Sequence, residues 1–286
     1  MNVLLLLVPV ITSTAIWPLN RYVMQNGGRG DVYGFWISSF AAIVAGTLSA
    51  YFHQSLAVPS LWVLGLVIGF AFSFGFCIVI NYCLKIGPTG PTVAANNMGL
   101  IGPVVVGLLW PIRHAITIPI GAGILLVAGA ILGFSFSSLG TERKLITTRW
   151  ALLASLGWFL AALSMTGQYV GSVIFPTIPL AQITVVNILA SLILLIFLIR
   201  RGASWFKKIE FLGGIINGFI QAIGGFTMLV ALQRMPSSLV FPVVVLTPLI
   251  LVLILSGVVY KERLTRLVWL ACGAGVIGLG LLAVFQ

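Results

Sequence analysis

Ten runs of apolar residues follow one another along the chain, separated by short polar links. They cover residues 3–24, 32–52, 60–84, 92–111 and 116–138, and then 149–172, 178–199, 209–232, 238–260 and 265–285. A helix needs about 20 apolar residues to cross a bilayer, whereas the strands of a membrane barrel alternate over about ten residues. These runs do not alternate. The pattern therefore predicts an all-α integral membrane protein with ten transmembrane helices and no soluble domain.

Composition supports a membrane protein. Hydrophobic residues make up 60% of the 286 residues and charged residues only 7%, whereas about 25% of the residues of a soluble domain are charged. The formal net charge of +11 comes from basic residues scattered between apolar runs, so we expect lipid headgroups rather than nucleic acid as their partners. Cys77, Cys83 and Cys272 lie inside apolar runs without metal-site spacing, which predicts neither a disulfide nor a metal or other cofactor.

The two halves of the chain resemble each other. LKIGP at 84–88 recurs as LQRMP at 232–236, and the glycines of GLVIGF at 65–70 return in GIINGF at 214–219, 149 residues later. Repeats of this kind predict a duplication within one membrane domain, with a first five-span repeat at 1–140 and a second at 141–286. Because each repeat has an odd number of spans, the second is expected to be inverted relative to the first.

Basic residues favour one side of the membrane. The links after the odd-numbered spans hold thirteen of them: Arg21, Arg29, Lys85, Arg143, Lys144, Arg149, Arg200, Arg201, Lys207, Lys208, Lys261, Arg263 and Arg266. The links after the even-numbered spans hold only Arg113 and Arg234. The positive-inside rule then places the odd links in the cytoplasm and both termini outside, with the cytoplasmic (plasma) membrane as the expected location.

The C-terminal sequence carries a resemblance to a known family. TPLILVLILSGVVYKERLTRLVWLACGAGVIGLGLLAVF, with Pro248, Glu262 and a glycine-rich last span, resembles an EamA-type repeat of the drug/metabolite transporter superfamily. The first half keeps Pro103 and the glycines, but it has Arg113 and His114 in place of an acidic residue. The resemblance implies a secondary transporter that moves a small organic solute through a central cavity between the repeats. We expect Glu262 to be structural, paired with its basic neighbours or capping the next helix.

Polar side chains inside the apolar runs are the candidates for a substrate site, because an amide has no water to bond in hydrocarbon. We expect Asn96 and Asn217 to face a shared central cavity. The further candidates are Asn97, Gln221, Asn81, Trp17, Asn20, Trp158 and Gln168. The alternative is that the asparagines only join helices through interhelical hydrogen bonds. Gln182 and Asn187 are weaker candidates, since span 178–199 is expected to face lipid or a dimer partner.

The function follows from which chemical groups are present at depth. The carboxylates Asp31, Glu142, Glu210 and Glu262 all fall in predicted links, and both histidines lie near span ends, which argues against an enzyme. Amides, hydroxyls and aromatic rings suit a neutral or zwitterionic polar solute such as an amino acid. A sugar or nucleoside uptake permease and a multidrug exporter are the alternatives. Without a mid-depth acid we expect a facilitator or exchanger, monomeric or homodimeric, driven by the solute's own gradient.

Overall fold

The computed structural model describes residues 2–86, 92, 96–110, 117–137, 147–202, 204, 206–259 and 266–285. Helices make up nearly all of this part of the chain, which contains no strand. They are α1 (Asn2–Gln25), α2 (Gly30–Tyr51), α3 (Pro59–Phe70), η1 (Ala71–Ile80), α4 (Asn81–Ile86), η2 (Met98–Leu100), α6 (Ile101–Leu109), α7 (Ile118–Ser137), α9 (Thr148–Ile174), α10 (Pro179–Arg201), α11 (Lys208–Leu232), α12 (Ser237–Val259) and α13 (Arg266–Phe285). The predicted all-α fold is confirmed.

The third predicted span is continuous but not uniformly α-helical. Its middle ten residues, η1, form a π-helix between α3 and α4. Insertions of π-helix into α-helices are uncommon and frequently occur at functional sites. Here the π-helical segment carries Phe72, which lines the cavity described below.

Six of the described helical segments are long and apolar enough to cross a membrane. They are Gly30–Tyr51, Pro59–Cys83, Thr148–Ile174, Pro179–Arg201, Lys208–Leu232 and Arg266–Val284, and three further apolar helices, Met98–Leu109, Ile118–Gly133 and Ser237–Leu251, are shorter. Large apolar side chains are freely exposed on the outside, as Leu125 (74%) and Leu270 (71%) illustrate. Exposure on this scale suits a lipid environment, and the protein is an integral membrane protein.

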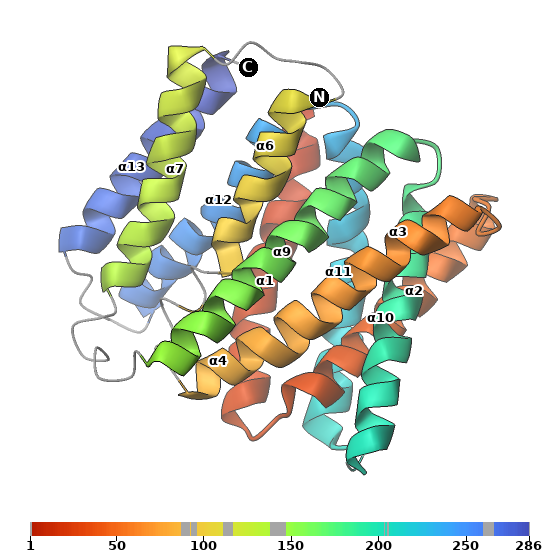
Figure 1. Ribbon diagram of the computed structural model, residues 1–286. Coiled ribbons are helices and arrows are strands. Elements are labelled where there is room, and N and C mark those ends of the chain that lie inside the picture. The colour runs from red at the N-terminus through yellow and green to blue at the C-terminus, as the bar shows by residue number, and fades with distance from the viewer. Residues whose placement is uncertain are drawn as a thin grey trace.

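The helices form one bundle with a paired extension at its side (Figure 1). In the main bundle α2 packs against α10 and α11, while α1 packs against α11 and α12, and α9 against α3 and η1. Helices α7 and α13 lie side by side at the edge of the bundle, next to α12. Helices from the first and second halves of the chain therefore alternate in space.

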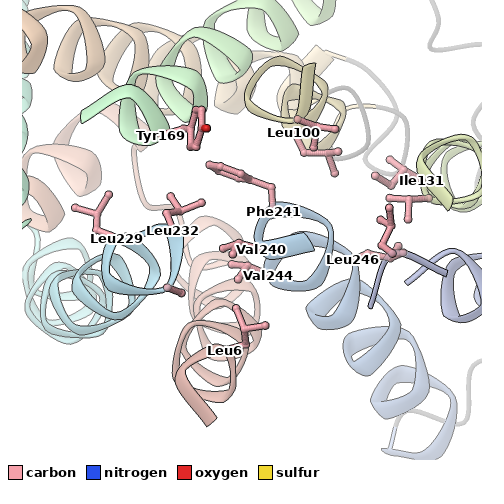
Figure 2. Packing of buried hydrophobic residues seen from close by; sticks show 14 of the residues in the cluster. Leu6, Leu100, Ile131, Tyr169, Leu229, Leu232, Val240, Phe241, Val244 and Leu246 are labelled. Carbon is pink, nitrogen blue, oxygen red and sulfur yellow. The ribbon is translucent and has the colours of Figure 1, made fainter. Parts of the chain in front are cut away.

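A cluster of buried apolar side chains joins these helices around α12 (Figure 2). Phe241 is 1% exposed and lies between Tyr169 of α9 and Leu100 of η2, with Leu232 of α11 close by. The Tyr169 hydroxyl donates a hydrogen bond to the Trp110 carbonyl at 2.8 Å. Because lipid is as apolar as these side chains, close packing and hydrogen bonding, rather than removal from water, stabilise such contacts in a membrane.

Two glycines allow two close helix contacts of the same form. A Cβ added at Gly218 of α11 would lie 2.7 Å from the Ile37 carbonyl oxygen and 2.9 Å from the Ala41 nitrogen of α2. A Cβ added at Gly69 of α3 would lie 2.9 Å from the Val186 carbonyl oxygen and 3.1 Å from the Ala190 nitrogen of α10. A side chain at either glycine would meet backbone, which cannot move aside. Each residue of one contact is 149 positions from its counterpart in the other.

Candidate functional site

A cavity of about 190 Å³ lies in the centre of the main bundle. Helices of both halves form its walls: α1, α3 and η1 from the first, and α9, α10, α11 and α12 from the second. The lining residues are Pro9, Thr12, Ser13, Ile16, Ile68, Phe72, Ser164, Gln168, Gln182, Ile183, Val186, Asn187, Ile220, Gln221, Gly224, Gly225, Met228, Leu229 and Val244. An apolar cavity with a few convergent polar groups is typical of a small-molecule site.

Two amides of α10 supply the most distinctive groups in this cavity. Gln182 and Asn187 are 2% and 3% exposed. The Asn187 Nδ2 donates to the Ile183 carbonyl at 2.9 Å, and the Gln182 Nε2 donates to the Gln168 carbonyl at 3.4 Å. The oxygen of each amide has no hydrogen-bond partner among the described residues. A buried acceptor without a partner is costly, so this arrangement favours a bound donor.

Gln168 and Gln221, two of the predicted site residues, also line the cavity, from α9 and α11. Span 178–199 was expected to face lipid or a dimer partner, but its helix α10 forms part of the cavity wall. Its polar residues Gln182, Thr184 and Asn187 are all buried. Two amides five residues apart in a largely apolar run were the sequence signal that could have indicated this role.

Asn20 and Asn217 meet in a second polar group that includes Tyr33, which sequence analysis did not single out. The Tyr33 hydroxyl donates to Asn20 Oδ1 at 2.9 Å, and Asn217 Nδ2 lies 2.8 Å from Asn20 Oδ1 and 2.9 Å from the Tyr33 oxygen. These three residues, the amide–tyrosine cluster, join α1, α2 and α11. In this structure the two asparagines link helices, which for Asn217 is what the alternative interpretation expects.

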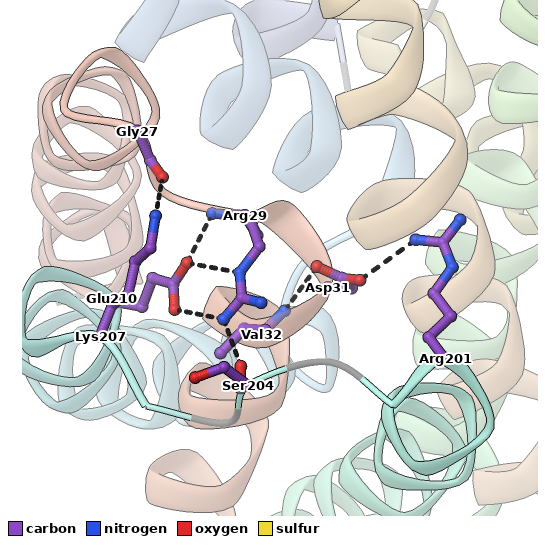
Figure 3. Close-up of polar contacts among 8 residues, drawn as sticks. All are labelled: Gly27, Arg29, Asp31, Val32, Arg201, Ser204, Lys207 and Glu210. Carbon is purple, nitrogen blue, oxygen red and sulfur yellow. Dashed lines mark hydrogen bonds and ion pairs between the residues drawn. The ribbon is translucent and has the colours of Figure 1, made fainter.

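A third polar group, the ionic cluster, lies at the ends of these helices and comprises Arg29, Asp31, Arg201, Lys207 and Glu210 (Figure 3). Glu210 is fully buried at the start of α11. Its carboxylate accepts hydrogen bonds from the Arg29 backbone N–H at 2.8 Å, from Nε at 3.1 Å and from a terminal guanidinium nitrogen at 3.2 Å. This bonding raises the pKa of the Arg29 guanidinium.

The other contacts of the ionic cluster extend it across the α10–α11 link. The Arg29 guanidinium donates to the Ser204 carbonyl, and Lys207 Nζ donates to the Gly27 carbonyl at 2.9 Å. Arg201, whose side chain is 61% exposed, lies 3.4 Å from an Asp31 carboxylate oxygen. The α1–α2 turn of the first half is thereby tied to the α10–α11 link of the second half.

The three polar groups lie at successive depths. Along α11 the rise of about 1.5 Å per residue places Glu210 about 10 Å from Asn217, and Asn217 about 6 Å from Gln221. Along α1 the order is the same, from the turn after Gln25 through Asn20 to Ile16 at the cavity. The amide–tyrosine cluster therefore separates the cavity from the ionic cluster.

The remaining predicted site residues that the structure describes are not among those lining this cavity. Asn96 and Asn97 are buried on a stretch that packs against α9, and the Asn97 Nδ2 has no hydrogen-bond partner among the residues that the structure describes. Asn81 Nδ2 donates to the Cys77 carbonyl at 3.0 Å. Trp158 is 42% exposed. The Trp17 side chain lies outside the described part.

Several charged residues of the sequence analysis also lie outside the described residues. They include Glu262 with its neighbours Lys261, Arg263 and Thr265, the pair Arg113 and His114, and Glu142. The expected structural role of Glu262 stays a prediction.

Comparison with known proteins finds a family match in the second half of the chain. Residues 148–284 match the EamA-like transporter family. The predicted resemblance to the drug/metabolite transporter superfamily is confirmed for residues 148–284. A solved crystal structure of a protein aligns with 99% of this chain and 96% of its own, with a TM-score of 0.81 at 13% sequence identity. At that identity the likeness concerns the fold alone. No curated protein matches the sequence.

Proposed function

We propose that this chain is a secondary transporter that carries a small neutral or zwitterionic polar solute, such as an amino acid or a related metabolite, by alternating access. The observation that carries the proposal is the central cavity, where two deeply buried amide oxygens lack partners and helices of both halves form the walls. EamA-type sequence in residues 148–284 supports transport as the activity. A cavity of about 190 Å³ suits an amino acid better than a nucleoside or a large drug.

The proposal includes two inverted repeats, residues 1–140 and 141–286. The paired glycine contacts support this arrangement, since α11 meets α2 through Gly218 in the way that α3 meets α10 through Gly69. Helix α1 packs on α11 and α12. In the same way α9 packs on η1 and on the consecutive helices η2 and α6. Two related halves that share an interface can rock about it, which is how inverted repeats produce alternating access.

Residues of the amide–tyrosine cluster correspond by sequence position to residues of the cavity wall. Gln182 and Ile68, which line the cavity, stand 149 positions from Tyr33 and Asn217, and Gln168 stands 148 positions from Asn20. The amide–tyrosine cluster, whose members bond to one another, thus corresponds to residues that line the cavity. In our proposal the two regions exchange roles when the transporter turns over: one separates, and the other closes.

We place the ionic cluster on the cytoplasmic face and both termini outside, in the cytoplasmic membrane. The basic residues Arg29, Arg201 and Lys207 at that end support this orientation through the positive-inside rule. Asn96, Asn97, Asn81, Trp17 and Trp158 remain proposed contributors to solute binding in other stages of the cycle. For coupling we propose a facilitator or exchanger, since the residues that line the cavity include no carboxylate or histidine.

Counterflow in proteoliposomes tests the function. A thermal-shift screen of the purified protein against amino acids, sugars, nucleosides and cationic dyes identifies the solute. Vesicles preloaded with unlabelled solute should then accumulate the labelled solute transiently, because a carrier exchanges one molecule for another. Absence of counterflow for every hit would overturn the proposal. Accumulation driven by an imposed pH or sodium gradient would overturn the facilitator mechanism and leave the carrier.

A further inference from the structure

The unpartnered amide oxygens specify the chemistry of the ligand. We propose that the ligand of the central cavity donates N–H or O–H hydrogen bonds to Gln182 Oε1 and Asn187 Oδ1, carries no net negative charge, and has an apolar body of roughly leucine size. This inference rests on the proposed transport function and narrows its substrate class. The donor can be the ammonium group of a zwitterion or the hydroxyl or amide of a neutral solute.

The orientation of the Asn187 amide is fixed by its own hydrogen bond. Its Nδ2 donates to the Ile183 carbonyl at 2.9 Å. A flipped amide would place Oδ1 against that carbonyl, and two acceptors repel each other. The oxygen is therefore the group left over for a ligand. It has no partner in the part of the chain that the structure describes, although the residue is only 3% exposed.

The Gln182 amide has the same arrangement one and a half turns earlier on α10. Its nitrogen is directed to the Gln168 carbonyl at 3.4 Å, and its oxygen lacks a partner. Gly171 of α9 leaves the space that this side chain occupies, since a Cβ there would collide with the Gln182 amide. Two acceptors on one helix, each with its nitrogen already bonded, lack a donor among the described residues, and in our proposal the ligand supplies it.

The charge of the cavity excludes an anionic head group. The residues that line it include no lysine, arginine or histidine. A carboxylate without a cationic partner would carry the full cost of desolvation. In a zwitterion the ammonium group offsets part of that cost, and in a neutral donor the cost does not arise.

The volume and the apolar wall determine the body of the ligand. An engineered protein cavity of about 150 Å³ holds benzene, so about 190 Å³ admits a body a few atoms larger. Ile16, Ile68, Phe72 and Met228 supply apolar surface from α1, α3, η1 and α11. A branched aliphatic chain with one polar head matches this combination.

A matched series with one isobutyl body tests the inference by direct binding to the purified protein. The probes are 4-methylpentanamide, 4-methylpentanol, leucine, 4-methylpentylamine, methyl 4-methylpentanoate and 4-methylpentanoate. We expect the amide and the alcohol to bind about tenfold more tightly than the ester, which has no donor, and the carboxylate to bind more weakly still. Leucine and the amine, compared with the amide, show whether an ammonium or a neutral donor is preferred.

Variants assign the effect to the two oxygens. Gln182→Met and Asn187→Leu keep side-chain size and remove the acceptors, so each should reduce amide binding about tenfold while ester binding stays within about twofold. Asn187→Asp should increase the affinity for 4-methylpentylamine, since a carboxylate replaces the amide oxygen. Gln233→Met is the matched control, because Gln233 lies at the end of α11 away from the cavity lining, and it should change neither affinity.

The outcomes separate this inference from the transport proposal. Equal binding of ester and amide, or preferred binding of the carboxylate, would overturn the donor requirement even if counterflow of another solute is observed. Failure of the whole series to bind would also overturn it. Donor-dependent binding without counterflow of the bound probe would support the ligand class and count against transport.

Discussion

The amide–tyrosine cluster and the α10 wall of the cavity differ in how their polar atoms are bonded, although Tyr33 of the first and Gln182 of the second stand 149 positions apart in the sequence. Asn20, Tyr33 and Asn217 bond to one another across three helices. Gln182 and Asn187 leave two buried oxygens unbonded. The first region holds helices together, whereas in our proposal the second receives a ligand. The first region shows that a polar residue within a membrane span can be structural.

The two ends of the bundle differ in a related way. The ion pair of Arg29 and Glu210 lies at the end next to the amide–tyrosine cluster, and the neutral amide of Gln54 lies at the opposite end. The Gln54 side-chain oxygen there accepts hydrogen bonds from the Leu180 and Ala181 N–H groups at 2.9 and 3.1 Å, at the start of α10. The start of α2 is instead held by the Glu210 carboxylate through the Arg29 N–H. Hydrogen bonds to charged groups are stronger than those between neutral groups. The Glu210 carboxylate is therefore expected to hold the start of α2 more strongly than Gln54 holds the start of α10.

The largest expected effect comes from removing the Glu210 carboxylate. Breaking a buried ion pair by deleting one partner costs about 3–5 kcal/mol, and we expect the lower part of this range for Glu210→Ala because Arg29 is partly exposed. Hydrogen exchange in the first turns of α2 and α11 should accelerate by roughly a hundredfold. The control is Asp31→Asn, which alters the exposed pair with Arg201 and should change exchange by less than about fivefold. Equal effects of the two substitutions would contradict the distinction.

Adding a methyl group at Gly218 should disturb the α2–α11 contact next most strongly. A Cβ there meets backbone atoms of Ile37 and Ala41, so Gly218→Ala forces the helices apart at a cost of about 1–3 kcal/mol. Gly69→Ala should have a similar cost at the α3–α10 contact, and a thermal-unfolding assay measures both. Gly129 is the control, because no atom lies within 4 Å of a Cβ built on it, and Gly129→Ala should be neutral. A neutral result at one of the two buried glycines would weaken the case for equivalent repeats.

Tyr33→Phe tests the bonded region without changing its shape. The substitution removes one hydrogen bond to Asn20 and one from Asn217, and it leaves the bond between the two amides. We expect a loss of about 1–3 kcal/mol, observed as faster exchange in α2 and α11. The substitution should also lower the population of the conformer that contains the cavity, and the apparent ligand affinity should fall in proportion. Gln182→Met should instead lower affinity without faster exchange, and matching behaviour of the two variants would refute the comparison.

Sequence patterns predicted the fold well because membrane helices are specified by long apolar runs. The third run, 60–84, corresponds to α3, η1 and α4, but its π-helical middle leaves no signature in hydropathy. The glycine repeats at 65–69 and 214–218, which the sequence offered as evidence of duplication, lie at the two close helix contacts. The inversion of the repeats and the orientation in the membrane stay predictions.

The candidate site was harder to predict, because a helical pattern gives the face of a residue but not the neighbour opposite it. Gln168 and Gln221 were named in advance and line the cavity, whereas Asn217 bonds to Asn20. Glu210 looked like an ordinary link charge, although it is fully buried and bonds to Arg29, which is distant in sequence. Distinguishing these roles requires knowing which helices meet, and one sequence does not contain that information.

The smallest effect should come from Gly171→Ala, which acts on the unbonded region alone. A Cβ at this position in α9 would collide with the Gln182 amide. The far end of that flexible side chain can move into the cavity, so the free energy of unfolding should change by less than about 1 kcal/mol. The displaced amide should reduce binding of a donor ligand such as 4-methylpentanamide about fivefold, as measured by titration calorimetry. An unchanged affinity would mean that Gln182 does not contact the ligand, and the binding role would then rest on Asn187.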